Sequence, residues 1–325
     1  MTGRPPRLFL IDGSSYIYRA FFALPPAVNS AGFPTNATYG FISFMMKFLK
    51  RHEPEYLAVV LDAGRQTFRH QLLSAYKNNR RQAPATLVLQ LPHIRRVLDA
   101  LNVIALGLQN YEADGLIGIL CATLCDQDCD LIVVSNDKDM MQLITNKVSL
   151  FDGVKERWIG ANEVMAKFGV EPERVPEVLG LMGDVVDNIP GIKGVGRKTA
   201  IALMQQFRDL EDLYGNLDQL QQSNSRGVAR LREALQEGKE TAFLSRDLAT
   251  IKKNVPLRID LEQLRFKGPS RDKMRSLFVE LEFNNLVKLL DHSHEFTSGI
   301  GPVALPQKPL PQQTMSLQLQ LFSWK

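Results

Sequence analysis

The 325-residue chain has few histidines, few cysteines and no long apolar run, and each shortage excludes a class of protein. Three cysteines are too few for a disulfide scaffold. Cys121, Cys125 and Cys129 could line one helical face as a thiolate metal site, although buried, reduced side chains are the more ordinary interpretation. No run approaches the roughly 18 apolar residues of a membrane span. The first residues also lack the apolar core of a signal peptide, so we expect a cytoplasmic protein.

The chain also lacks a large excess of charge of one sign, since its net charge is only +4. This total does not indicate nucleic-acid binding by itself, because it does not show where the charges gather. Hydrophobic residues, by contrast, make up 45% of the chain, so a large core can be buried. The class of the protein must therefore be inferred from its local patterns.

Short apolar runs alternate with longer amphipathic segments over the first part of the chain. We expect strands at 8–11, 57–61, 103–106 and 131–134, and helices at 35–50, 87–101 and 113–125. The alternation predicts an α/β domain at residues 1–180, with a parallel sheet covered on both faces. Residues 181–292 predict a helical region, and the proline- and glutamine-rich residues 293–325 predict a flexible tail.

Acidic residues follow three of the expected strands and recur in two further segments. They are Asp12, Asp62, Glu112, Asp114, Asp137, Asp139, Asp184 and Asp187, the last two predicted on one face of a helical turn. Any one of them could simply cap a helix, but parallel strands bring their carboxyl ends to one edge. So many gathered carboxylates require cations, and oxygen ligands suit Mg²⁺ or Mn²⁺. Two such ions could hydrolyse a phosphodiester.

Two further segments indicate contact with nucleic acid. Residues 188–200 predict a helix, a glycine-rich hairpin and a second helix, whose backbone N–H groups could meet a phosphate. The hairpin residues concerned are Gly191, Lys193, Gly194, Gly196, Arg197 and Lys198, although a turn without a ligand is the alternative. Residues 68–81 mix aromatic and basic side chains, which suits a single strand, but alone they would fit a solvated helix face.

Taken in order, these segments resemble the 5′→3′ exonuclease domain of bacterial DNA polymerase I, in the flap-endonuclease superfamily. The resemblance rests on residues 11–20, 68–80, 137–143 and 183–200 and extends over about residues 7–290. It implies a parallel-sheet, resolvase-like (PIN-like) nuclease domain with a helical arch, followed by a helix-hairpin-helix region. It also implies a metal-dependent 5′→3′ exonuclease and 5′ flap endonuclease that acts in primer removal and DNA repair.

The resemblance also implies roles for individual residues. Asp12, Asp62, Glu112 and Asp114 would serve one Mg²⁺ or Mn²⁺ ion, and Asp114, Asp137, Asp139, Asp184 and Asp187 the second. Arg19, Lys77 and Arg80 would hold the scissile phosphate and the 5′ strand, with Arg69 and Tyr76 as further DNA contacts. The hairpin would grip branched or nicked duplex DNA downstream of the 5′ end, with a K⁺ ion on its carbonyls.

The sequence departs from this family in two ways. Gly115 stands where bacterial members usually carry a further acid directly after Glu-Ala-Asp, so we expect weaker binding of one ion. Nothing after residue 290 resembles a proofreading or polymerase domain, so we expect a free-standing nuclease or a fragment of a longer protein, and the irregular tail favours the first. We also expect a monomer. A catalytically impaired paralogue that binds branched DNA is the main alternative, but it should have lost several acids. A toxin-like RNA nuclease is disfavoured by the hairpin.

The C-terminal tail carries one further motif. Gln318, Leu319, Leu321 and Phe322 lie in Gln-Leu-Gln-Leu-Phe, which resembles the peptide by which bacterial replication proteins bind the sliding clamp. Leu321 and Phe322 could fill an apolar pocket, and Gln318 could add hydrogen bonds. A low-complexity tail or a helix packed on the body is the alternative.

Overall fold

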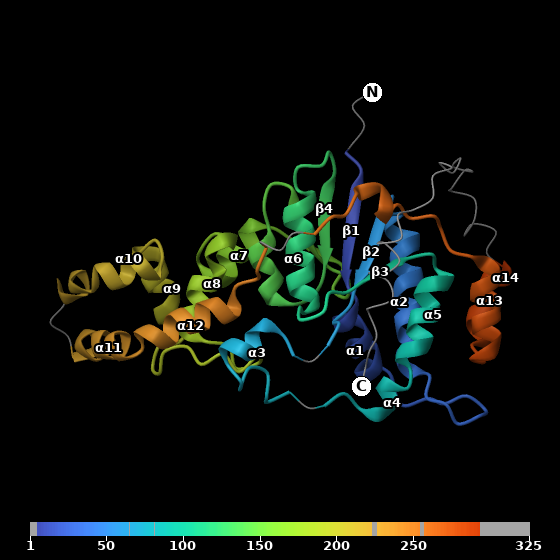
Figure 1. Ribbon diagram of the computed structural model, residues 1–325, viewed down its shortest axis with the longest axis horizontal. Coiled ribbons are helices and arrows are strands. Elements are labelled where there is room, and N and C mark those ends of the chain that lie inside the picture. Colours follow the sequence, from blue (N-terminus) through green and yellow to red (C-terminus); the bar gives the residue numbers. More distant parts are fainter. Residues whose placement is uncertain (1–4, 65, 81, 223–225, 254–256, 293–325) are drawn as a thin grey trace.

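The structure is a computed structural model, and its core is a six-stranded sheet (Figure 1). It describes residues 5–292 except 65, 81, 223–225 and 254–256. The strands are β1 (Arg7–Asp12), β2 (Tyr56–Val60), β3 (Ile104–Leu106), β4 (Asp130–Val134), β5 (Val148–Asp152) and β6 (Arg157–Ile159). Their order is β3-β2-β1-β4-β5-β6, and only β6 pairs antiparallel among these strands. The expected α/β fold is confirmed, and the sheet expected to be parallel is parallel except for β6.

Strand β1 lies at the centre of the sheet, and its register aligns the ends of its neighbours. Asp12 is opposite Val60 at the end of β2, and Ile11 is opposite Val134 at the end of β4. All three strands are buried on both faces, which explains their unbroken apolar sequences. Residues that directly follow these strands therefore meet at one edge, which faces downward in Figure 1.

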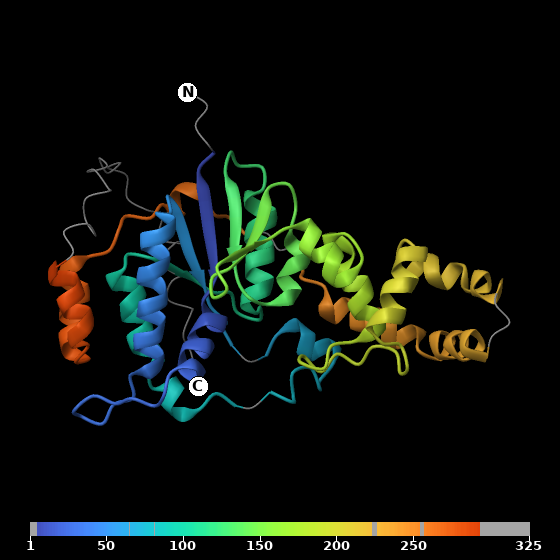
Figure 2. The same cartoon turned by 180° about the vertical axis from the view of Figure 1, so that it is seen from behind.

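Helices cover both faces of the sheet. Phe9 and Ile11 face the helices α1 (Gly13–Ala23), α2 (Asn36–His52) and α5 (Leu91–Ala100). Leu8 and Leu10 face α6 (Ala113–Leu124) on the opposite side. Figures 1 and 2 show α2 and α5 on one side of the sheet and α6 on the other. The alternation of side chains along β1 thus divides the interior into two apolar clusters.

The later helices form a second region beside the α6 face. They are α7 (Ala161–Phe168), η2 (Pro172–Arg174), α8 (Val175–Met182), α9 (Arg197–Gln206), α10 (Leu210–Gly215), η3 (Leu217–Gln222), α11 (Arg226–Glu237) and α12 (Lys239–Ala249). Helix α12 packs against α8, while α10 and α11 project at the far end of the molecule (Figure 1). The chain then returns through η4 (Leu261–Leu264) to α13 (Arg271–Glu280) and α14 (Asn284–His292). These last helices join the α2 and α5 side.

Three short elements surround the edge where the strands end. They are α3 (Phe68–Leu72), α4 (Ala85–Val88) and the 3₁₀ helix η1 (Lys138–Leu143). The expected helix at 87–101 is divided into α4 and α5. Pro92 lies in the first turn of α5, where a proline is favoured, and it does not continue the preceding helix. Only 68–72 of the expected arch segment is helical among its described residues.

Two strands were not expected from the sequence. In β5 only one residue, Ser149, is exposed, and β6 has just three residues, so neither gives a long apolar run. No helix among the described residues is long and apolar enough to cross a membrane. The clamp-like peptide lies in 293–325, outside the described residues.

Candidate active site

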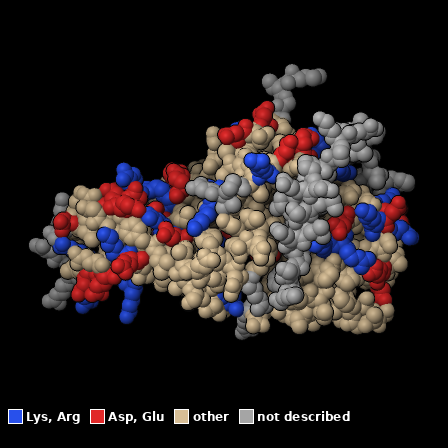
Figure 3. All heavy atoms as spheres, in the orientation of Figure 1, with Lys and Arg blue, Asp and Glu red and all other residues tan. Residues whose placement is uncertain are grey.

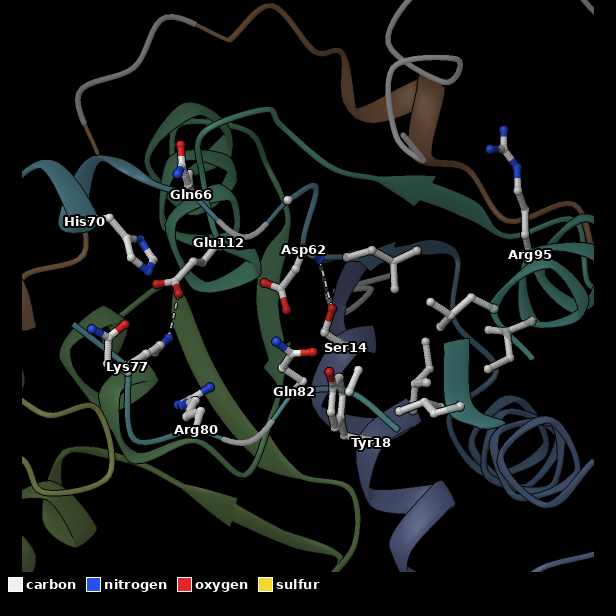
Figure 4. A pocket seen from close by; sticks show the side chains of 18 residues that line it. Ser14, Tyr18, Asp62, Gln66, His70, Lys77, Arg80, Gln82, Arg95 and Glu112 are labelled. Carbon is white, nitrogen blue, oxygen red and sulfur yellow. Dashed lines mark hydrogen bonds and ion pairs between the residues drawn. The ribbon is translucent and has the colours of Figure 1, made fainter. Parts of the chain in front are cut away.

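The first two acids lie at the ends of adjacent strands and are held by their own neighbours. Asp12 accepts hydrogen bonds from the Ser135 hydroxyl at 2.9 Å and from the Ser15 N–H at 3.2 Å. Asp62 accepts the N–H of Ala113, the first residue of α6, at 2.8 Å. Its own N–H donates to the Ser14 hydroxyl (Figure 4). Both carboxylates thus interact with helix N-termini and still stand at the carboxyl edge of the sheet.

A second group of acids comes from η1 and from the turn after α8. Asp137 accepts the N–H of Asp139 at 3.0 Å, and Asp139 is buried. Asp184 and Asp187 are also buried, and one oxygen from each of Asp139, Asp184 and Asp187 lies within 4.8 Å of the others. These three residues are the group nearest to a metal-ligand geometry among the described residues, and no cysteine belongs to it.

The turn that carries Asp184 and Asp187 is not helical, contrary to the expectation. The backbones of Asp184 and Ile189 pair as an antiparallel bridge that closes the turn. Gly183 has a φ of +71°, and a Cβ there would approach the Ile189 carbonyl oxygen to 2.6 Å. Gly191 has a φ of +62°, and a Cβ there would overlap the Gly183 nitrogen at 2.3 Å. Glycine at both positions therefore allows the acidic turn and the hairpin to pack together.

Burial and mutual repulsion make several of these acids hard to ionise. Burial, followed by the nearby Asp62 and Asp137, raises the pKa of Asp12 to about 7. Burial and Asp137 likewise raise the pKa of Asp139 to about 8. Burial also raises the pKa values of Asp62 and Asp137. Such a cluster holds its negative charge only when cations stabilise it.

The donor set and one orphaned atom fit divalent cations. Every candidate ligand is a carboxylate oxygen, which suits Mg²⁺ or Mn²⁺ better than zinc. Asp139 Oδ1 is buried without a hydrogen-bond partner among the described residues, and the Lys138 Nζ atom is 3.6 Å away. A bound cation would satisfy this oxygen and lower the pKa of the neighbouring acids.

On the arch side of the site, the acids are paired with basic side chains. Glu112 accepts hydrogen bonds from Lys77 at 2.7 Å and Tyr76 at 3.1 Å, and it also pairs with Arg69. Arg69 binds both oxygens of Asp114, at 2.8 and 3.1 Å. Burial alone would raise the pKa of Asp114, but Arg69 and Lys77 outweigh it and lower that pKa.

The segment around Lys77 is bonded directly to the acidic turn. The Lys77 N–H donates to the Asp187 carbonyl at 3.0 Å. The Asn79 amide donates to the Val185 carbonyl at 2.7 Å, and the Asn188 amide donates to the Ala75 carbonyl at 2.6 Å. Arg80 completes the junction by pairing with the Asp187 carboxylate. Asn79 and Asn188 are not among the site residues expected from the sequence, because their partners are more than 100 residues away.

The residues expected to contact DNA fall into two groups. Arg19, Lys193, Arg197 and Lys198 are exposed, as are Gly194 and Gly196, whereas Gly191 is buried at the base of the hairpin. Arg69 and Tyr76 each have a relative exposure of 2%, and their polar atoms bind Glu112. Burial of Arg69 and Tyr76 therefore does not fit the direct DNA contact expected of both.

A cavity of about 550 Å³ lies between the arch segment and α5 (Figure 4). Asp62, Glu112, Lys77 and Arg80 line it on the polar side, where Figure 4 shows the Lys77 and Glu112 side chains bonded to each other. Its apolar lining includes Leu87, Leu91 and Ile94.

The surface of the projecting helices carries both signs of charge. Figure 3 shows acidic and basic side chains mixed there, so the face in this view has no large patch of one sign over these helices.

Two family models match this architecture in succession. Residues 7–169 match the N-terminal resolvase-like domain of 5′-3′ exonucleases, and residues 170–272 match their C-terminal SAM fold. The chain is 37% identical over 284 residues to a 5′-3′ exonuclease of Aquifex aeolicus, covering 87% of this chain and 95% of that protein. It is 38% identical over 290 residues to DNA polymerase I of Caldicellulosiruptor bescii, covering 87% of this chain.

That alignment spans only 33% of the polymerase, so the chain corresponds to about a third of such relatives. Among solved structures, the fold is similar to the bacteriophage T5 D15 flap endonuclease in a complex with DNA and metal ions. That match has a TM-score of 0.59 at 19% identity and covers 88% of this chain and all of the other. With this fold, these matches and a buried carboxylate cluster at the sheet edge, the chain belongs to the 5′-3′ exonuclease family.

Proposed function

We propose that this chain hydrolyses DNA phosphodiesters near a 5′ end, as a 5′→3′ exonuclease and 5′ flap endonuclease with two divalent ions. The observation that carries the proposal is the gathering of all eight predicted acids around one edge of the sheet. When bound, two Mg²⁺ or Mn²⁺ ions would polarise the phosphodiester and make a water molecule more acidic. Primer removal during replication and DNA repair are processes in which such 5′ ends occur.

The chain's own residues would divide the remaining tasks. Asp12, Asp62, Glu112 and Asp114 would hold one ion, and Asp114, Asp137, Asp139, Asp184 and Asp187 would hold the other. Lys77 and Arg80 now neutralise Glu112 and Asp187, and they would turn to the scissile phosphate once cations replace them there. The exposed Arg19 would hold the 5′ strand near the same place.

The hairpin would supply affinity for duplex DNA without reading its sequence. Lys193, Arg197 and Lys198 are exposed around the start of α9, where unpaired backbone N–H groups favour a phosphate. A K⁺ ion on the hairpin carbonyls would add to this grip. Because all eight acids come from one chain, we propose that the monomer is the active form.

A flap assay tests this function directly. A 5′-labelled flap duplex should be cut in Mg²⁺ and remain intact when EDTA is added. A blunt duplex and a single strand of the same sequence serve as matched substrates and should be cut more slowly. Binding of the flap without any cleavage in Mg²⁺ or Mn²⁺ would favour the impaired paralogue, and preferential cleavage of RNA would favour a toxin-like nuclease.

The tail supports a second, separate proposal, which is docking to the bacterial sliding clamp. Gln318, Leu319, Leu321 and Phe322 supply the polar and apolar groups of a short anchor peptide. The preceding 25 or so residues would span roughly 28 Å as a coil and would raise the local concentration of the nuclease near DNA. Deletion of residues 318–325 should abolish clamp binding in a fluorescence titration, and unchanged affinity would refute the proposal.

A further inference from the structure

Arg69 is the most deeply buried cation among the described residues of the arch segment, and every nitrogen of its guanidinium has a partner. Two of its nitrogens bind Asp114 and Glu112. Its Nε donates to the Leu248 carbonyl of α12 at 2.9 Å. The guanidinium also lies 5.2 Å from the centre of the Phe68 ring and 5.8 Å from that of Tyr76. The planar group is thus fixed between two metal-ligand candidates and the end of a helix.

Gln142 makes an equivalent connection from the other half of the acid cluster. It belongs to η1, which also carries Asp139, and its side chain is buried. Its Nε2 donates to the carbonyls of Asp139 and Ala249, both at 3.0 Å. Its Oε1 accepts the Ile251 N–H at 2.8 Å. Gln142 therefore ties the segment that carries Asp139 to the same end of α12.

The carbonyls at the end of α12 explain why both side chains converge there. The last carbonyls of a helix have no partner inside the helix and favour donors, particularly cationic ones. Leu248 and Ala249 are the last two residues of α12, and they receive Arg69 and Gln142 respectively. One turn earlier, the Ser245 hydroxyl accepts the N–H of Gly191 at 3.0 Å. Helix α12 thus contacts both halves of the acid cluster and the hairpin.

We propose that Arg69 and Gln142 are positioning residues of the metal site, anchored on the C-terminal carbonyls of α12. Arg69 fixes the orientation of Glu112 and Asp114, and Gln142 fixes the backbone of Asp139. Neither side chain contacts DNA. The inference rests on the proposed metal-dependent function, and it assigns to Arg69 a role different from the DNA contact that its sequence predicts.

Metal binding in the absence of DNA separates this role from a DNA contact. Arg69→Lys keeps the charge but loses the planar fork, so it isolates the effect of orientation. In the full-length protein, Mn²⁺ titrated by calorimetry should bind about tenfold more weakly to this variant, the loss typical of changes behind metal ligands. The Kd for a 5′ flap duplex, measured by fluorescence anisotropy in EDTA, should change less than about twofold. Unchanged Mn²⁺ affinity would overturn the proposal.

Arg80→Lys is the matched control, because Arg80 also pairs with an acid of the cluster. Its side chain is half exposed, so it is free to turn to a phosphate. This variant should weaken flap binding in EDTA more than it weakens Mn²⁺ binding, which is the reverse of the Arg69→Lys pattern. The same pattern in both variants would show that burial does not separate the two roles and would refute the proposal.

Gln142→Met provides an independent test should Arg69→Lys fail to fold. Methionine is uncharged and similar in length but cannot bond Ala249 or Asp139. Circular dichroism would verify that the variant is folded, and its Mn²⁺ affinity should fall while flap binding in EDTA stays unchanged. Wild-type protein that binds Mn²⁺ but does not cut the flap would refute the proposed function without affecting this comparison.

Discussion

The acid cluster has two sides, and they solve the problem of buried negative charge differently. On the arch side, Glu112 and Asp114 are paired with Arg69 and Lys77, and the pKa of Asp114 is lowered. At the sheet edge, Asp12 is held by neutral donors, and its burial, followed by the nearby Asp62 and Asp137, raises its pKa. The chain thus neutralises Glu112 and Asp114 with its own basic side chains, whereas the acids around Asp12 depend on added cations.

The sheet-edge side should be the more sensitive to loss of an acid. We expect Asp137→Ala to reduce flap cleavage in Mg²⁺ by at least about 10³-fold, because the second ion loses a ligand and its charge stabilisation. Flap binding in EDTA should be kept or improved, since one source of repulsion toward phosphate is gone. Single-turnover cleavage and anisotropy measure the two effects, and cleavage at the wild-type rate would contradict the two-ion mechanism.

The arch side should respond to loss of a cation. Lys77→Met removes the charge but keeps the length of the side chain, and we expect cleavage to fall by about 10²-fold. Lys77→Arg should recover most of this loss, because a cation again faces Glu112 and the phosphate. Single-turnover rates at saturating Mg²⁺ would decide, and equal rates for the Met and Arg variants would show that the charge is not used.

The raised pKa values at the sheet edge predict proton release when metal binds. At a pH of about 7, Asp12 and Asp139 are each protonated in a large share of metal-free molecules, given pKa values of about 7 and about 8. Mn²⁺ binding should therefore release protons and strengthen as the pH rises from about 6 to about 8. Calorimetry in two buffers with different ionisation enthalpies measures this release.

The same pKa values set the sign of the pH effect on stability. Because the folded pKa values of Asp12 and Asp139 exceed the usual value of 3.8, the folded state holds more protons above that pH. The metal-free protein should therefore lose stability as the pH rises toward about 8, and Mg²⁺ should reverse that loss. A melting temperature that rises over this range without metal would contradict the assignment.

The smallest effect on cleavage is expected from adding an acid at Gly115, on the arch side. A Cβ at Gly115 would meet only the Tyr111 side chain among the residues described, at 3.4 and 3.9 Å, so a side chain fits there. We expect Gly115→Asp to lower the Mg²⁺ concentration for half-maximal cleavage by about threefold, because ligand charge strengthens binding. Gly115→Asn controls for shape, and coincident Mg²⁺ titrations of Asp and wild type would place this position away from the ions.

The ends of the central strands could be predicted because each signal is local. The apolar run before Asp12 predicts a buried strand, and parallel strands bring Asp12, Asp62 and Asp137 together. The burial of Arg69 could not be predicted, since it depends on the Leu248 carbonyl, 179 residues away. Basic residues in an aromatic segment favour a surface role in sequence, and only the tertiary contacts of Arg69 and Tyr76 show otherwise.

The sequence distance between the acids and the end of α12 affects when the site can form during synthesis of the chain. Its acids come from segments between Asp12 and Asp187, and Arg69 and Gln142 find their partners only at Leu248 and Ala249. A chain emerging from the ribosome therefore has no complete site until about 250 residues have been translated, and contacts so distant in sequence form slowly. Truncated translation products and early folding intermediates would then lack the fully positioned acids of the proposed metal site.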